Sequence, residues 1–263
     1  MSGTLPEPKL KIILVGLTGV GKTSVMNTLL GIEDQKHGLD PSSQTTGCKM
    51  ATAQHGDQEL VIIDTPGVYN TEKTEEEVKK DIMESIAHAA LDGGPHVFLL
   101  VMRPDRCSED EKEAVEIIQK IFGDGFKDYT LVLFTRGGRH VPTYKEVKKE
   151  MKFLRKFIHG DDSFHSFECK NVNGEEKEKQ VSDLVKKINN MVANNSEQNK
   201  PRYTNEMLKK AQEIQKEMEM SEPNGTEAEK LCKTVEKFVS GVVGEPWVRY
   251  LNKIVDRAIE KYC

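Results

Sequence analysis

The chain has 263 residues, of which 38 are lysine or arginine and 43 are aspartate or glutamate, so its formal net charge is −5. This length corresponds to about one or two domains, and the mild acidity argues against general nucleic-acid binding. The longest apolar run, residues 97–102, is far shorter than the ~18 residues that a membrane span needs. The 5 cysteines lack paired spacing, which indicates reduced thiols in a cytoplasmic protein, without a disulfide framework or zinc site.

Strand-like and helix-like segments alternate along most of the chain. Residues 9–15, 60–63, 97–102 and 129–134 are nearly continuous apolar runs, which are typical of a parallel sheet covered on both faces. Apolar residues recur at helical spacing over residues 74–89, 108–121, 145–157 and 178–191, and the first two of these segments begin with capping boxes. The alternation predicts a doubly wound, mostly parallel α/β domain over residues 8–195.

The composition changes after a polar segment, residues 194–202, which is predicted to be a linker. Lysine and glutamate then dominate, and apolar residues recur at helical spacing over residues 203–218 and 247–262. We therefore expect a helical C-terminal extension over residues 203–263. An apolar stripe of this kind usually packs against its own domain, and less often faces a partner protein or a membrane surface.

A glycine-rich segment matches the pattern G-x-x-x-x-G-K-[ST], with a predicted strand before it and an amphipathic helix after it. Glycines let successive backbone N–H groups curve around a polyphosphate, and the helix N-terminus adds partial positive charge. Lys22 is placed to neutralise the β- and γ-phosphates, and Thr23 offers its hydroxyl to Mg²⁺. A glycine-rich turn without a ligand fits this context much less well. The predicted nucleotide-binding residues here are Gly16, Leu17, Thr18, Gly19, Val20, Gly21, Lys22, Thr23 and Ser24.

A second motif, Asp64-Thr65-Pro66-Gly67, ends a buried strand. An acidic residue at this place, about forty residues after a phosphate loop, is suited to a second Mg²⁺ contact. Gly67 has no side chain, so its N–H can approach a γ-phosphate. The alternative for Asp64 is that it caps the next helix, and the phosphate loop makes that interpretation the weaker one.

A polar loop, residues 42–47, lies between the two motifs. Thr45 or Thr46 could bring its hydroxyl to Mg²⁺ when a γ-phosphate is bound, which would make the loop a switch. An ordinary surface loop has the same composition, and spacing alone does not choose between the two threonines.

Together these motifs resemble the GTPases of the immunity-associated proteins, also called immune-associated nucleotide-binding proteins, which have an AIG1-type G domain. The similarity covers about residues 8–210. The matching segments lie at residues 16–23, 43–48, 64–67, 94–101, 133–136 and 203–207, and residues 94–101 resemble the family's "conserved box". The resemblance implies a Ras-like P-loop fold, binding of GTP or GDP with Mg²⁺, homodimerisation through the nucleotide face in the GTP state, and Thr45 as the switch threonine.

Two features bear on hydrolysis. Val68 follows Gly67, where Ras-like enzymes place a glutamine that orients the attacking water, so we expect slow intrinsic turnover. The resemblance also implies an arginine that is supplied across the dimer, and the matching residue is Arg106. Such an arginine would stabilise charge in the transition state, but an exposed arginine at a helix start is an equally good interpretation.

The guanine-reading motif departs from the family pattern. Thr135 and Arg136 are followed by Gly137-Gly138-Arg139-His140, without the acid that accepts hydrogen bonds from guanine. Arginine has donors only, so it cannot replace an acceptor. Arg136 could stack its stem on the base, and Glu168 could supply the missing acceptor. Two alternatives to a regulatory GTPase therefore stay open: a nucleotide-binding scaffold with little or no turnover, and a P-loop protein with relaxed base choice that includes ATP.

Overall fold

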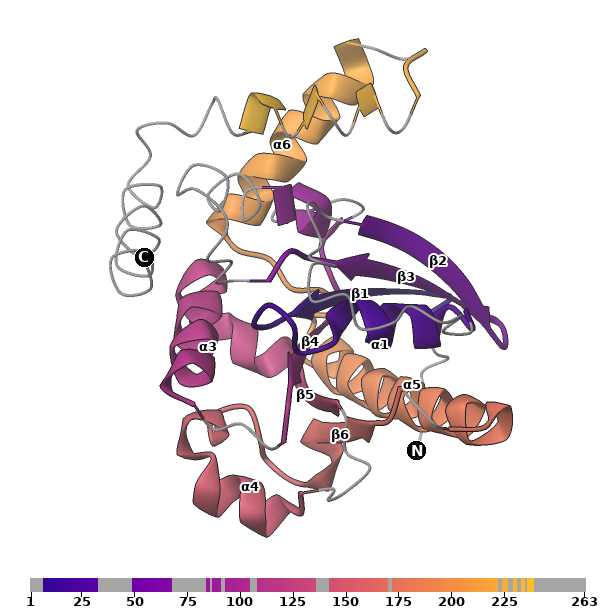
Figure 1. Cartoon of the computed structure of the whole chain (residues 1–263). Helices are drawn as coiled ribbons and strands as arrows, with labels where there is room; N and C mark the ends of the chain where they lie inside the picture. Colours follow the sequence, from indigo (N-terminus) through magenta and orange to yellow (C-terminus); the bar gives the residue numbers. More distant parts are fainter. Residues whose placement is uncertain are drawn as a thin grey trace.

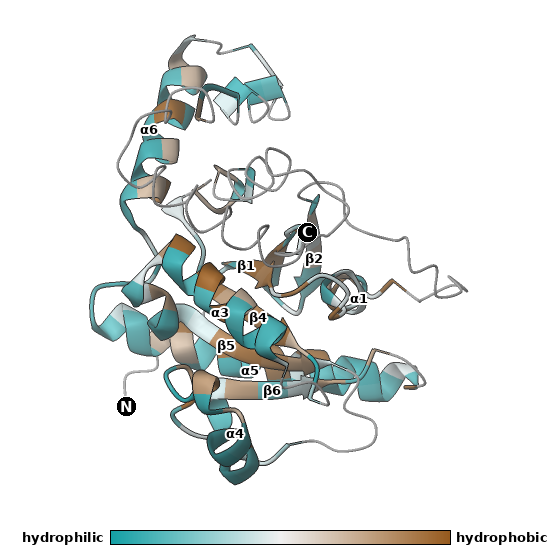
Figure 2. Ribbon diagram, turned by 60° about the vertical axis from the view of Figure 1, so that its left-hand side comes forward, coloured by the Kyte–Doolittle hydropathy of each residue, from teal (hydrophilic) through white to brown (hydrophobic). Residues whose placement is uncertain are grey.

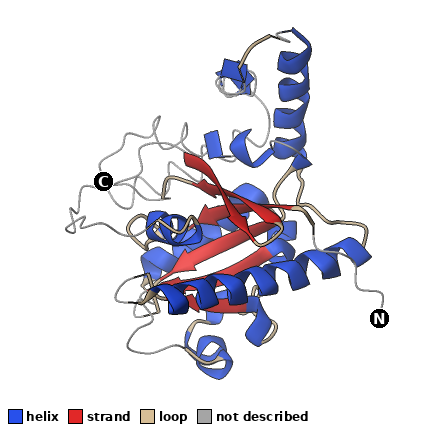
Figure 3. Ribbon diagram, turned by 90° about the vertical axis from the view of Figure 1, so that its right-hand side faces the viewer, coloured by secondary structure: helices blue, strands red, loops and turns tan. Residues whose placement is uncertain are grey.

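The described parts of the computed structural model form one six-stranded sheet with helices on both of its faces (Figures 1 and 3). Their residues are 7–32, 49–67, 84–85, 87–90, 93–104, 108–135, 142–169, 172–221, 224–226, 229–230, 233–234 and 236–238. Hydrophobic residues are concentrated in the strands and on the helix faces next to them (Figure 2).

The sheet has the strand order β2-β3-β1-β4-β5-β6. Five strands are parallel, and only β2 is antiparallel to its neighbour β3. The central strands β1, β4 and β5 are buried along almost their whole length, as their apolar sequences predict. The doubly wound α/β fold is confirmed. The strands are β1 (Lys9–Val15), β2 (Lys49–His55), β3 (Gln58–Asp64), β4 (Val97–Met102), β5 (Thr130–Thr135) and β6 (Phe164–Phe167).

Helices cover the sheet in two groups, each with its own hydrophobic cluster. The buried residues of α1 and α5 pack on one face, and those of α3, α4 and α6 pack on the other. The helices are α1 (Lys22–Leu29), α3 (Glu109–Phe122), α4 (Tyr144–Glu150), α5 (Gly174–Glu197) and α6 (Glu206–Ser221), with short 3-10 helices η2 (Asp124–Tyr129), η3 (Lys152–Leu154) and η4 (Asp161–Ser163).

Several elements differ from the sequence prediction. Strands β2 and β6 are not predicted, because β2 is half-exposed and short of large apolar residues while β6 has only four residues. The helix predicted over residues 145–157 is shorter, since α4 ends at Glu150 and a 3-10 turn follows. The helix predicted over residues 178–191 is longer and begins where the Asn173 side chain accepts a hydrogen bond from the Glu176 N–H. Most of the helix predicted over residues 74–89 lies outside the described residues.

The first part of the predicted C-terminal extension packs on the core of the sheet. Four residues of α6, namely Met207, Leu208, Ala211 and Ile214, belong to the same hydrophobic cluster as β4 and β5. The Tyr203 N–H donates to the Pro95 carbonyl, 2.9 Å away, which fixes the approach to α6 beside the start of β4. Residues 239–263 lie outside the described part of the chain. Among the residues that are described, no helix combines the length and the hydrophobicity that crossing a bilayer requires.

Candidate functional site

The glycine-rich loop leaves the carboxyl end of β1 and enters α1, so the predicted strand, loop and helix are all present (Figure 1). Gly16 has φ +149°, and a Cβ at this position would lie 2.4 Å from the Val101 carbonyl oxygen of the neighbouring strand β4. Gly21 is the N-cap of α1 with φ 103°, and no side chain caps the first N–H groups of the helix. Those N–H groups can therefore bind the oxygens of an anion.

Lys22 folds back over this loop. Its side chain is 6% exposed, and its Nζ donates to the Gly16 carbonyl at 3.1 Å and to the Leu17 carbonyl at 2.9 Å. Burial lowers the pKa of Lys22 to about 8, and attraction to Asp64 opposes that shift. An ammonium group has three donors, so a cation held this way can direct one more N–H toward a phosphate.

Thr23 and Asp64 form the predicted pair of metal ligands. The Thr23 hydroxyl donates to Oδ2 of Asp64 at 2.6 Å, and Asp64 is fully buried at the carboxyl end of β3. Hydroxyl and carboxylate oxygens suit Mg²⁺, which usually keeps several waters and binds phosphate oxygens as well. In the described part of the chain, no group of three or more histidine, cysteine, aspartate or glutamate side chains could hold a metal ion. The hydroxyl of Thr23 and the carboxylate of Asp64 are a ligand pair that fits Mg²⁺ held jointly with a polyphosphate.

Gly67 comes into direct contact with the glycine-rich loop. A Cβ at this position would lie 2.3 Å from Thr18 Oγ1 and 2.5 Å from both the Cα and the N of Thr18. Any side chain at residue 67 is therefore excluded by the loop. The neighbouring Thr65 hydroxyl donates to the Leu14 carbonyl at 2.7 Å, which ties the end of β3 to β1 beside the loop. The sequence pattern does not indicate this hydrogen bond between Thr65 and Leu14.

Thr135 lies against the back of the loop. It is 1% exposed, and its hydroxyl is 2.5 Å from the Val20 carbonyl oxygen and 3.2 Å from that of Met102. The hydroxyl thus joins the end of β5 to the loop and to the end of β4. The sequence predicts Thr135 as a nucleotide-binding residue and does not predict this contact. Glu168 follows β6 at the same edge of the sheet, and its N–H donates to Oε1 of Gln180 in α5 at 2.7 Å.

The structure thus brings together one part of the predicted site and leaves another part as a prediction. The glycine-rich loop, Asp64 and Gly67 meet at the carboxyl ends of β1 and β3, and Thr135 contacts the loop from β5. Thr45, Arg106 and Arg136 lie outside the described residues, as do Val68 and residues 137–140. Their parts in metal binding, hydrolysis and base recognition stay predictions.

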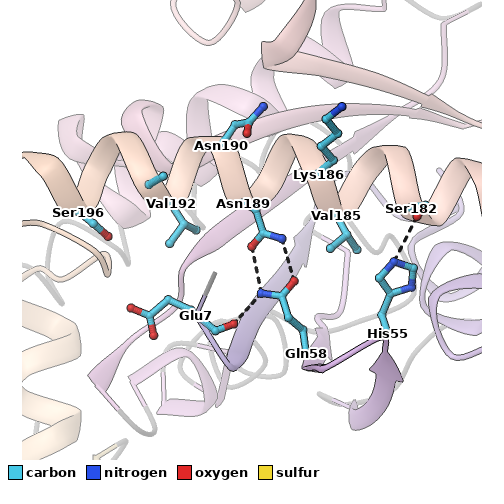
Figure 4. Close-up of a pocket in the computed structure, with 11 residues that line it drawn as sticks. Glu7, His55, Gln58, Ser182, Val185, Lys186, Asn189, Asn190, Val192 and Ser196 are labelled. Atoms are coloured by element: carbon cyan, nitrogen blue, oxygen red, sulfur yellow. Dashed lines mark hydrogen bonds between the residues drawn. The ribbon is translucent and has the colours of Figure 1, made fainter. Parts of the chain in front are cut away.

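A cavity of about 680 Å³ lies elsewhere, between the β2–β3 hairpin, Glu7 and α5 (Figure 4). The side-chain amides of Gln58 and Asn189 form a reciprocal pair, with N···O distances of 3.1 and 2.7 Å, and Gln58 also donates to the Glu7 carbonyl at 2.6 Å. Ser182 Oγ lies 3.5 Å from Nε2 of His55. Gln58 begins β3 and Asp64 ends it, so this cavity is at the opposite end of the strand from the glycine-rich loop.

Curated relatives of the chain are plant and animal nucleotide-binding proteins. Immune-associated nucleotide-binding protein 9 of Arabidopsis thaliana is 28% identical over 215 residues, which cover 79% of this chain and 61% of the relative. Protein 8 of the same series is 30% identical over 243 residues, 88% of this chain and 67% of the relative. GTPase IMAP family member 8 of Homo sapiens is 28% identical over 191 residues, 71% of this chain and 27% of the relative. The chain thus spans only part of these proteins.

Solved structures with the same fold include Toc33 from Arabidopsis thaliana. The complex of Toc33 with GDP and Mg²⁺ matches with a TM-score of 0.54 and 20% identity, over 72% of this chain and 86% of Toc33. The complex with Mg²⁺ and GMPPNP matches with a TM-score of 0.54 and 21% identity, over 71% and 85%. The sequence itself matches the AIG1 family over residues 10–222, a span that includes the glycine-rich loop, Asp64 and Gly67. The chain therefore belongs to the AIG1 family and carries an AIG1-type G domain.

Proposed function

We propose that this protein is a Mg²⁺-dependent regulatory GTPase that binds guanine nucleotides, hydrolyses GTP slowly on its own and dimerises through its nucleotide face in the GTP state. The observation that carries the proposal is the 2.6 Å contact of the Thr23 hydroxyl with Asp64, next to a buried Lys22 on the same loop. Family membership supports it, as do the Toc33 complexes with GDP, GMPPNP and Mg²⁺.

Each part of the site has a role in this proposal. The N–H groups of residues 16–24 bind the phosphates, and Lys22 neutralises the β- and γ-phosphates. Thr23 and Asp64 hold Mg²⁺, which neutralises phosphate charge when it is bound, and Thr45 joins them in the triphosphate state. The N–H of Gly67 meets the γ-phosphate.

Slow hydrolysis and dimerisation are linked in the proposal. Val68 cannot orient a water molecule, so an isolated protomer has little means to activate one. Arg106 from a second protomer would stabilise the charge that develops on the phosphoryl group. Dimerization is important for the GTPase activity of the chloroplast translocon components atToc33 and psToc159, and the corresponding solved structure shares the fold of this chain, with a TM-score of 0.52.

A second candidate function rests on the sequence after β5. Thr135, Arg136 and Glu168 are the proposed base contacts, and residues 137–140 contain no acid to accept hydrogen bonds from guanine. The absence of this acid is compatible with a nucleotide-binding scaffold that has little turnover or relaxed base choice. The relative affinities for GTP and ATP separate this candidate from the regulatory GTPase.

Titration calorimetry on nucleotide-stripped protein tests the proposal. With Mg²⁺ present, we expect GTP and GDP to bind and ATP to bind more weakly, and Lys22→Ala to abolish the heat of binding. Chelating Mg²⁺ should weaken GTP binding in the wild type, and Thr23→Ala should remove this dependence on Mg²⁺. Equal binding of ATP and GTP would favour the second candidate, and no heat with any purine triphosphate would refute both.

We also propose that the protein acts in the cytoplasm and that its C-terminal helices contact a partner protein or an intracellular membrane surface. The exposed end of α6, where Met220 is 76% exposed, supports such a contact. Flotation of the full chain with vesicles of defined lipid composition, with and without a triphosphate, tests the membrane part. Flotation is expected to fall in Met220→Glu and when residues 222–263 are removed, and its absence from wild-type samples would refute that part.

A further inference from the structure

One buried hydroxyl in the phosphate site is unsatisfied. Thr18 Oγ1 is inaccessible to solvent and has no hydrogen-bond partner among the residues that the structure describes. Buried polar side chains normally have a partner, and an exception calls for an explanation. Three other buried threonines follow the rule: Thr65, just after β3, donates to the Leu14 carbonyl, and in β5 Thr130 donates to the Phe126 carbonyl and Thr135 to the Val20 carbonyl.

The position of this hydroxyl points to the γ-phosphate end of the site. Thr18 Oγ1 lies 2.3 Å from the place where a Cβ of residue 67 would be, so it fills the space that Gly67 leaves open. The N–H of Gly67 is the group proposed to bind the γ-phosphate, so the proposed function puts the neighbouring Thr18 hydroxyl beside that phosphate. Lys22, which is proposed to neutralise the same phosphate, contacts the loop next to Thr18, since its Nζ donates to the carbonyl of Leu17, the residue before Thr18.

We propose that the Thr18 hydroxyl donates a hydrogen bond to a γ-phosphate oxygen and thereby makes the loop prefer a triphosphate to a diphosphate. The inference rests on the proposed function, because it assigns a task to one side chain of that site. A hydrogen bond to an ionised oxygen is about twice as strong as a neutral one, so this single contact can be measured in binding. With a diphosphate bound, the hydroxyl has no such acceptor and stays unsatisfied.

Two substitutions distinguish the effect of the Thr18 hydroxyl on binding from the effect of the side chain's shape. Thr18→Val keeps the branched shape and removes the donor, whereas Thr18→Ser keeps the donor and removes a methyl group. Because the hydroxyl has no partner in the described structure, its loss in Thr18→Val should not lower the melting temperature of the nucleotide-free protein. Thr130→Val is the matched control, since it removes a buried hydroxyl that donates to the Phe126 carbonyl at the other end of β5.

The experiment measures the affinities of the full chain for GDP and for the non-hydrolysable triphosphate GMPPNP, both with Mg²⁺, by titration calorimetry. For Thr18→Val we expect the affinity for GMPPNP to fall about tenfold while that for GDP changes less than about twofold. Thr18→Ser should keep the wild-type ratio of the two affinities. Thr130→Val should lower the melting temperature and leave that ratio unchanged.

The outcomes distinguish this inference from the function on which it rests. A wild-type chain that binds neither nucleotide refutes the proposed function and the inference with it. Wild-type binding combined with an unchanged GMPPNP-to-GDP ratio in Thr18→Val overturns the inference alone. An equal loss of both nucleotides, or a loss of GMPPNP affinity in Thr18→Ser as large as in Thr18→Val, overturns it as well, because shape rather than the donor would then matter.

Discussion

Nucleotide affinity should depend on pH through Lys22. Burial lowers the pKa of this side chain to about 8 in the nucleotide-free protein, so a large part of the population is neutral in mildly alkaline solution. A bound polyphosphate favours the protonated form and raises the pKa again. Binding above the lowered pKa therefore takes up a proton, and affinity must fall as the pH rises.

The size of the effect follows from the fraction of Lys22 that is protonated before binding. With a pKa of about 8, this fraction falls from about 0.9 near pH 7 to about 0.25 near pH 8.5. Affinity should then fall about fourfold over this interval, which corresponds to about 0.8 kcal/mol. The uptake of protons on binding should rise over the same interval from about 0.1 to about 0.75 per nucleotide.

Calorimetry in buffers with different ionisation enthalpies measures this proton uptake directly. GDP is a suitable ligand because its phosphates change their ionisation little above neutral pH. A constant affinity and no proton uptake between about pH 7.5 and pH 8.5 would refute the assignment of Lys22 to the phosphates. The free energy of unfolding depends on pH in the opposite sense. Between the lowered pKa of Lys22 and its ordinary value of 10.5, the unfolded chain binds more protons than the folded chain. The contribution of Lys22 to the free energy of unfolding therefore rises with pH.

Three further predictions concern hydrolysis, base choice and stability. Arg106→Ala should lower GTP turnover at protein concentrations that allow dimers while leaving nucleotide affinity nearly intact; a loss of affinity alone would place this arginine elsewhere. Gly138→Asp should strengthen the preference for GTP over ATP in competition binding, and an unchanged ratio would mean that other residues read the base. Asn205→Ala should lower the free energy of unfolding by about 1 kcal/mol in urea titrations. Its side chain accepts from the Leu208 N–H at 2.8 Å and donates to the Phe122 carbonyl, so unchanged stability would contradict this capping role.

The fold was predictable where burial acts on both faces of a strand. β1, β4 and β5 are central strands, and each is a run of apolar residues that could be read without knowing its neighbours. β2 could not be found this way, since it lies at the edge of the sheet, four of its seven residues are exposed and none is buried. Its place is set by pairing with β3, a contact between segments that no local pattern records.

The ends of the helices could also be predicted only where a local sequence signal marks them. Ser108 was recognisable as an N-cap, and its side chain accepts a hydrogen bond from the Glu111 N–H as expected. α5 begins several residues before its predicted start because Asn173 caps it, although its first turns are mostly exposed and carry little apolar periodicity. A search based on apolar spacing finds only the buried part of such a helix.

In the candidate phosphate site, residue types could be predicted from the sequence, but the contacts of individual side chains could not. Lys22, Thr23 and Asp64 could be singled out because phosphate and magnesium chemistry needs these residue types at that spacing, and the structure places the three close together. The contacts of the neighbouring threonines were not predictable in this way. They depend on which backbone atoms the fold brings within hydrogen-bond distance of each hydroxyl. Thr135 meets the Val20 carbonyl and supports the loop from behind, whereas Thr18 meets no acceptor among the described residues and faces Gly67. The sequence motifs indicate that both threonines serve the nucleotide, but they do not indicate which carbonyl, if any, the fold brings within reach of each hydroxyl.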